Sequence, residues 1–257
     1  MTGIVSDDGA GRDAPDPAAF LASSAEVLAE PVELHLDETV LDFWRRRIAQ
    51  HLTEYYAGVR LSKFPEDLRV LEQLLFAQRP DAVLEIGCQF ASSSLWIADR
   101  LASIARYGGP SDALVVAMDI DTAAAEVALD TVDPAWRERI VLIEADITDP
   151  SLPGRVEEVL GPRRNCMVIE DSAHTYETTI AALDGFARFV APGGYLVVED
   201  GVVDVEELRL RPDWPRGVHR AIDEFLAGPE GAGFVRRAEL EPYGLTSHPG
   251  GYLQRRG

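Results

Sequence analysis

The chain has 257 residues, which is enough for one large α/β domain with additions or for two small domains. Its formal net charge of −20 argues against non-specific binding to nucleic acids and against docking on anionic membranes, because both need a basic face. There are only two cysteines, Cys88 and Cys166, and no stretch of transmembrane length and no signal peptide is recognisable. We therefore expect reduced thiols and a cytoplasmic protein.

The first 78 residues predict a tail and a helical cap. Residues 1–16 are rich in Asp, Gly and Pro, which is typical of disorder. Residues 17–78 are expected to form an N-terminal helical extension that caps the main domain, residues 79–257, or provides a contact in a homo-oligomer. Helical patterns occur at Ala18–Leu28, Glu38–Tyr56 and Pro65–Ala77.

From Ala82 onwards, apolar runs and helical segments alternate regularly. This alternation is typical of a doubly wound, Rossmann-like parallel sheet. Near the C-terminus, Phe234–Leu240 and Leu245–Leu253 face each other across Glu241–Gly244, which predicts an antiparallel hairpin and seven strands in all. The five parallel strands are expected at Ala82–Ile86, Ala113–Met118, Ile140–Glu144, Cys166–Ile169 and Gly194–Val198.

The stretch from Asn165 to Asp200 holds the densest group of reactive side chains. Two parallel strands joined by a right-handed helical crossover leave both carboxyl ends at one edge of a sheet. Asp171, His174, Glu199 and Asp200 should therefore lie together where α/β sheets bind ligands. Three carboxylates at one place are costly unless a cation lies among them. We expect Asp171, Glu199 and Asp200 to bind Mg²⁺ or another divalent cation.

The loops after the first three strands predict a cofactor pocket. Gly87 is the only glycine of its loop, so the three-glycine fingerprint of NAD-binding proteins is missing. Asp119 could accept both hydroxyls of a ribose and Asp146 could bind an adenine amino group, although each acid alone could be a solvated loop residue. Three such loops in register favour S-adenosylmethionine over NAD. The expected cofactor-binding residues are Glu85, Gly87, Ser92, Ser93, Asp119, Asp121, Asp146 and Asp171.

The motifs E-I-G, M-D-I-D and E-A-D in these loops resemble those of class I S-adenosylmethionine-dependent methyltransferases. A narrower resemblance, from about Ala57 to the C-terminus, is to the cephalosporin hydroxylase / rhamnosyl O-methyltransferase family. It implies a metal-dependent O-methyltransferase acting on a small-molecule sugar or nucleotide sugar. The stretches that carry it are Gly58–Lys63, Val168–His174, Gly193–Asp200 and His248–Leu253.

The spacing of the acids also resembles that of catechol and macrolide sugar O-methyltransferases. Glu199 lies 28 residues after Asp171, and Asp200 follows directly. In those enzymes the general base lies three residues after the first ligand, a position that His174 occupies here. Other relatives carry D-S-D-H, with Asp where this chain has Ala173, which leaves the first ligand open. His219 and His248 are further candidate bases.

Three carboxylates on a six-coordinate Mg²⁺ leave room for two adjacent substrate oxygens, so we infer methyl transfer to one hydroxyl of a vicinal diol. The resemblance implies a deoxysugar, with nucleotide-linked rhamnose as the leading acceptor and antibiotic biosynthesis as the setting. Two alternatives stay open. One is an O-methyltransferase for a glycosylated or catechol-like natural product. The other is a non-catalytic adenosine-binding assembly protein, in which the acids would be mere surface. An iron site of the facial-triad type is not indicated, because no second histidine accompanies His174 and Glu177.

Overall fold

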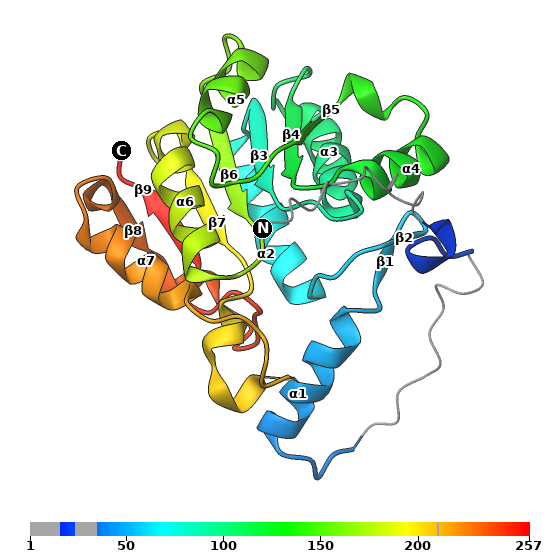
Figure 1. The fold of residues 1–257 in the computed structure, drawn as a ribbon, viewed down its shortest axis with the longest axis vertical. Helices are drawn as coiled ribbons and strands as arrows, with labels where there is room; N and C mark the ends of the chain where they lie inside the picture. Colours follow the sequence, from blue (N-terminus) through cyan, green and yellow to red (C-terminus); the bar gives the residue numbers. More distant parts are fainter. Residues whose placement is uncertain (1–15, 24–34, 210) are drawn as a thin grey trace, which may run out of the picture.

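The computed structural model describes residues 16–23, 35–209 and 211–257. Almost all of the predicted disordered tail lies outside these residues. A seven-stranded sheet forms the centre of the molecule, in the order β5-β4-β3-β6-β7-β9-β8 (Figure 1). Its first five strands are parallel and the last two pair antiparallel, so the predicted fold class is confirmed. The strands are β3 (Ala82–Ile86), β4 (Leu114–Asp119), β5 (Ile140–Glu144), β6 (Cys166–Glu170), β7 (Tyr195–Val198), β8 (Phe234–Arg236) and β9 (Tyr252–Arg255).

Helices cover both faces of the sheet because the side chains of each strand alternate between two apolar cores. Leu84 of β3 packs in one core with Val156 and Leu183, while its neighbour Val83 packs in the other with Leu74. Full burial of each such aliphatic side chain contributes about 1.5–3 kcal/mol to the free energy of unfolding. The helices are α2 (Pro65–Gln78), α3 (Ser92–Ala105) and α4 (Ala123–Val132) on the Val83 face, and α5 (Leu152–Leu160), α6 (Tyr176–Phe186) and α7 (Val218–Ala227) on the Leu84 face.

The N-terminal extension is less helical than its sequence predicts. Helix α1 (Val40–His51) is shorter than expected, because Tyr55–Tyr56 (β1) pairs with Val59–Arg60 (β2) in a small separate sheet. The described part of the predicted first helix, up to Ser23, is a single 3-10 turn, and Leu21 then forms a bridge to Val59. Figure 1 shows α1 apart from the two helix layers. The division at residue 78 stays a prediction, since α2 shares a core with β3.

The C-terminal pair of strands is antiparallel as expected, and the chain turns at Glu241–Gly244, where the N–H of Gly244 donates to the carbonyl of Glu241. The hairpin predicted directly around this turn is wrong. β8 and β9 are short and pair through Val235 and Gln254, and a long connection joins them. The connection does not continue the ladder, because the side chains of Thr246 and Ser247 are buried against α2 instead. No helix among the described residues is long and apolar enough to cross a membrane.

The site is positioned by the neighbouring strands β3 and β6, where the direction of winding reverses. Parallel sheets bind ligands at the carboxyl ends of such a strand pair. Here the loops that follow β3 and β6 are in contact: the N–H of Asp171 donates to the carbonyl of Ile86 at 2.7 Å. Gly87 has φ +85°, and a Cβ at this position would collide with the backbone of Asp171. Glycine is therefore required by the close approach of the two loops.

Candidate active site

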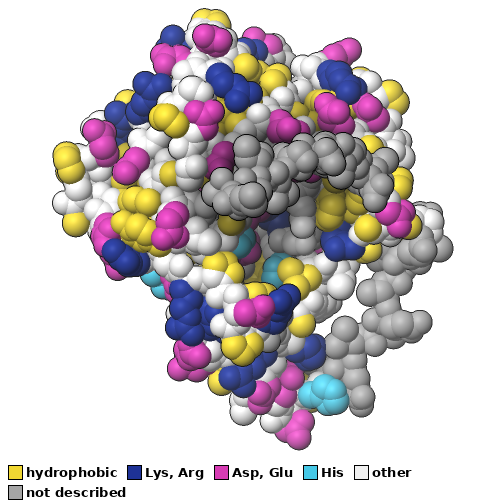
Figure 2. Space-filling view, in the orientation of Figure 1, with side chains coloured by type: hydrophobic (Ala, Val, Ile, Leu, Met, Phe, Trp, Pro, Cys, Tyr) yellow, Lys and Arg dark blue, Asp and Glu magenta, His cyan; other side chains and the backbone are white. Residues whose placement is uncertain are grey.

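A cavity of about 580 Å³ opens at the carboxyl ends of the parallel strands. Figure 2 shows this face of the molecule hollowed near its middle, with histidine side chains visible inside. The loops after β3, β4 and β5 form one wall, which we call the β3–β5 side. The loops after β6 and β7 form the opposite wall, the β6–β7 side, and α1 and the segment before α2 close the remaining edge.

Asp119 organises the β3–β5 side. Its Oδ2 accepts hydrogen bonds from the backbone N–H groups of Cys88 and Gln89, at 2.9 and 2.8 Å. The carboxylate thus fixes the loop after β3, in which Gln89 and Ala91 adopt left-handed conformations. Among the described residues, the contact of its second oxygen, Oδ1, is a long one, 3.4 Å from the backbone nitrogen of Asp121. Asp119 therefore holds the loop with one oxygen and offers the other to a ligand.

Most of the expected cofactor-binding residues line the cavity. Those that do are Gly87, Ser92, Ser93, Asp119, Asp146 and Asp171. Glu85 is not among them: its side chain is fully buried behind the wall and accepts a hydrogen bond from Ser94. Asp121 also lies off the cavity, where its Oδ1 accepts from the N–H of Ala123 at the start of α4. The roles of all these residues remain predictions.

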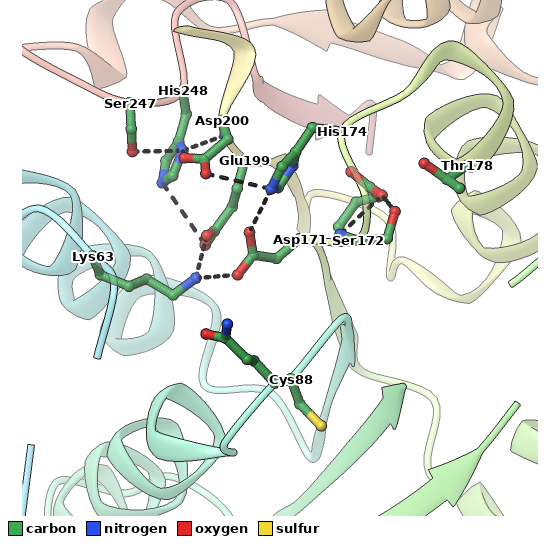
Figure 3. Close-up of polar contacts among 12 residues, drawn as sticks. Lys63, Cys88, Asp171, Ser172, His174, Thr178, Glu199, Asp200, Ser247 and His248 are labelled. Carbon is green, nitrogen blue, oxygen red and sulfur yellow. Dashed lines mark hydrogen bonds and ion pairs between the residues drawn. The ribbon is translucent and has the colours of Figure 1, made fainter. Parts of the chain in front are cut away.

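Lys63, in the segment before α2, is the cation that pairs with the β6–β7 side, and sequence reasoning gave it no role. Its Nζ lies 2.7 Å from Oδ2 of Asp171 and also forms an ion pair with Oε2 of Glu199 (Figure 3). Lys63 is 4% exposed. Burial lowers the pKa of its ammonium, but the carboxylates of Asp171 and Glu199 outweigh burial and raise that pKa well above the ordinary value. The lysine is therefore charged and neutralises part of the acidic group.

His174 bridges the two carboxylates that face the cavity. Its Nε2 lies 3.4 Å from Oδ2 of Asp200 and 4.0 Å from Oδ1 of Asp171. Burial lowers the pKa of the imidazole, but Asp200 and Asp171 outweigh it and raise the pKa above its ordinary value. His174 and Asp200 have φ of +55° and +52°, a region that residues other than glycine seldom adopt. Such backbone strain costs about 1–3 kcal/mol per residue and is concentrated at functional sites.

Residues from the C-terminal connection and α2 support this side from behind. The backbone N–H of Asp200 donates to Nδ1 of His248 at 3.0 Å, so the imidazole proton of neutral His248 must be on Nε2. That Nε2 lies 3.7 Å from Glu199 and from the buried Asp67. Asp67 in turn accepts hydrogen bonds from Thr246, Ser247 and Tyr252. Lys63 and His248 lie in stretches that carry the family resemblance, and this was the signal in the sequence that could have identified them. No sequence signal pointed to Asp67.

The expected metal ligands are only partly assembled as predicted. Oxygens of Asp171 and Asp200 and a ring nitrogen of His174 lie within 4.8 Å of one another, whereas Glu199 is buried and paired with Lys63. Burial raises the pKa of Glu199 well above its ordinary value, whereas at Asp200 the neighbouring His174 and His248 outweigh burial and lower the pKa. Asp200 therefore carries negative charge at the cavity wall. Oxygen ligands with residual negative charge suit a divalent cation. The residues therefore fit such an ion, with Asp171 and Asp200 as the carboxylates that reach it. The other candidate base, His219, does not line the cavity, and its Nε2 lies 2.9 Å from the carbonyl of Pro249.

A family model described as rhamnosyl O-methyltransferase/CmcI matches residues 49–256. The chain belongs to this family. Among its relatives, the rhamnosyl O-methyltransferase of Mycobacterium tuberculosis is 26% identical over 208 residues, which cover 78% of this chain and 77% of that protein. The rhamnosyl O-methyltransferase of Mycobacterium leprae is 25% identical over 209 residues, 79% of this chain and 84% of that protein. Family membership places the chain among the O-methyltransferases.

Solved structures of CmcI share the fold. An apo structure superposes with a TM-score of 0.57 at 18% identity and covers 90% of this chain and 91% of that one. A second, described as Mg-SAM, has a TM-score of 0.54 at 19% identity and covers 80% of this chain and 78% of that one. At such identities the likeness concerns the fold, and the family rests on the sequence match.

Proposed function

We propose that this chain transfers the methyl group of S-adenosylmethionine to a hydroxyl of a sugar. The observation that carries the proposal is one continuous cavity with two unlike walls. On the β3–β5 side, Asp119 and Asp146 could bind the nucleoside of the donor. On the β6–β7 side, Asp171, His174 and Asp200 could bind the acceptor and take the proton of its hydroxyl. A donor and an acceptor can therefore meet inside a single enclosure.

The residues of the chain divide the reaction between them. The cavity brings the acceptor oxygen near the sulfonium methyl group, and such positioning supplies up to about 7–11 kcal/mol of the acceleration. His174 takes the hydroxyl proton on Nε2 as the oxygen attacks, and Asp200, 3.4 Å from that nitrogen, stabilises the imidazolium that forms. Lys63 keeps Asp171 and Glu199 in register. A divalent cation bound by Asp171 and Asp200 would acidify the hydroxyl and offset the carboxylates that favour a proton on His174.

The acceptor is proposed to be a deoxysugar with two adjacent hydroxyls. Support comes from the relatives, which are named rhamnosyl O-methyltransferases, and from the CmcI structure described as Mg-SAM. The narrowest form of the proposal is nucleotide-linked rhamnose in antibiotic biosynthesis, like the substrate of the nucleotide-rhamnose 3-O-methyltransferase of the calicheamicin pathway. A homo-oligomer belongs to the same proposal.

The test is a mass-shift assay with S-adenosylmethionine and a panel that contains nucleotide-linked rhamnose, methyl rhamnoside and a catechol. We expect a gain of one methyl group on a rhamnose, abolished by a chelator and restored by Mg²⁺. Calorimetry with S-adenosylhomocysteine gives an independent readout of the cofactor pocket. Binding of S-adenosylhomocysteine without methylation of any sugar would refute the sugar acceptor. Turnover that survives chelation would refute the dependence on a metal.

A further inference from the structure

His51 is a cavity residue supplied from outside the sheet. It is the last residue of α1, and its ring packs edge-on against Phe64 with 4.8 Å between ring centroids. The ring is 3% exposed. Its Nδ1 lies 2.5 Å from the carbonyl oxygen of Ile48. A carbonyl can only accept a hydrogen bond, so Nδ1 carries the proton and the lone pair of the neutral ring is on Nε2.

The Nε2 atom of His51 has no hydrogen-bond partner among residues 16–23, 35–209 and 211–257. Several unpaired side-chain atoms of the described residues are sealed from solvent, but Nε2 of His51 is not one of them. Solvent therefore reaches this nitrogen. Since His51 lines the cavity, we take Nε2 to be reached from that side. A fixed ring with a free, accessible lone pair is a ready hydrogen-bond acceptor.

The surroundings place His51 on the acceptor half of the cavity. Ile48 of α1 and Phe64, which the ring contacts, pack in one apolar cluster with Val202 and Leu208 of the segment after β7. Asp200 at the start of that segment, together with Lys63 and His248, acts on the charge of the ring. Burial lowers the pKa of His51, and Asp200 opposes this without reversing it, so the ring is neutral at neutral pH. His174 offers no such free nitrogen, because its Nε2 faces Asp200 and its Nδ1 is sealed from solvent.

We propose that His51 binds the methyl acceptor, its Nε2 accepting a hydrogen bond from a hydroxyl that is not methylated. This inference rests on the proposed function and adds a specificity determinant to it. Helix α1 thereby contributes directly to acceptor choice. An acceptor that lacks the hydroxyl would leave the buried nitrogen unpaired, and it should be used less well, by about tenfold in kcat/KM.

The experiment compares the wild type with His51→Phe and His51→Gln. Phenylalanine keeps the packing against Phe64 but removes both nitrogens, whereas glutamine returns an oxygen acceptor near the place of Nε2. The substrates are the rhamnose acceptor methylated in the mass-shift assay and its monodeoxy analogues. His35→Phe, which removes an exposed histidine ahead of α1, is the matched control.

We expect His51→Phe to raise KM for the acceptor about tenfold with little change in kcat or in affinity for S-adenosylhomocysteine. One deoxy analogue should be penalised in the wild type but not in this variant, and His51→Gln should restore part of the discrimination. The role of His51 would be overturned by an unchanged acceptor KM in the variant, or by deoxy-analogue penalties that are the same in the variant as in the wild type. Either result would leave the proposed function intact. If His51→Phe does not fold, His51→Leu, which also lacks a hydrogen-bond acceptor, replaces it in the same analogue series. A wild type that methylates no sugar overturns both.

Discussion

The two walls of the cavity are built in different ways. On the β3–β5 side Asp119 and Asp146 are held by their own or an adjacent loop, as when Asp119 accepts from Cys88 and Gln89. On the β6–β7 side Asp171 and Glu199 are tied by Lys63, and Asp200 is tied by His248, 48 residues further along the chain. The first wall depends on hydrogen bonds within and between neighbouring loops, and the second depends on buried charges from distant segments. Substitutions should therefore damage the second wall more.

The largest effect is expected for Lys63→Met. Removing one partner of a buried charge cluster leaves uncompensated carboxylates and costs roughly 3–5 kcal/mol in the free energy of unfolding. Denaturant unfolding measures the loss. The control is Arg188→Met, which breaks the exposed pair between Arg188 and Glu157 and should cost no more than about 1 kcal/mol. Equal stability of the two variants would mean that the buried cluster needs no cation.

His174→Ala is expected to reduce turnover by roughly 10²–10⁴-fold, because it removes the proposed general base. Affinity for S-adenosylhomocysteine should be retained, since the β3–β5 side is untouched. A base must be neutral to accept a proton, so wild-type activity should rise with pH. Because the carboxylates raise the pKa of His174, this rise should lie above about pH 6.5 unless a bound cation offsets them. A variant that keeps its turnover and pH profile would place the base elsewhere.

On the opposite wall, Asp119→Ala should weaken binding of S-adenosylhomocysteine by about 1.5–3 kcal/mol, the usual contribution of a hydrogen bond to a charged group. Calorimetry measures this directly. Asp121→Ala is the matched comparison, because that carboxylate lies off the cavity. Similar losses in the two variants would show that loop structure, and not contact with the ligand, sets the affinity.

The smallest effect is a pH dependence of stability from His51. Its folded-state pKa is lowered, so the unfolded chain takes up the proton first as the pH falls. The contribution of His51 to the free energy of unfolding is fully present above about pH 6.5. It is lost as the pH falls through the lower folded-state pKa, and the free energy then changes by at most about 1.4 kcal/mol per pH unit. His51→Gln should flatten this part of the unfolding curve. An unchanged curve would contradict the assignment.

The contrast between the two walls also explains how much of the site could be predicted from the sequence. Asp119, Asp171 and Asp200 each follow an apolar strand, so their shared edge could be inferred from periodicity and the handedness of the crossovers. Lys63 could not be placed, since no local pattern indicates which loop will meet two distant carboxylates. The hairpin predicted around the turn at Glu241–Gly244 failed for a similar reason, although the turn itself forms. Its local signal was good, but buried hydrogen bonds to Asp67 determine the path of the following residues.

Asp67 also bears on the order in which the molecule folds. Its hydrogen-bond partners Thr246, Ser247 and Tyr252 are 179, 180 and 185 residues away along the chain. Contacts of such long sequence separation close large loops and form slowly. The hydrogen bonds of Asp119 span only 30 and 31 residues and can form earlier. The hydrogen bonds of Asp67 behind Asp200 must wait for β9 to enter the sheet between β7 and β8. During refolding, binding of S-adenosylhomocysteine should therefore recover before methyl transfer does, and simultaneous recovery would argue against a stepwise assembly.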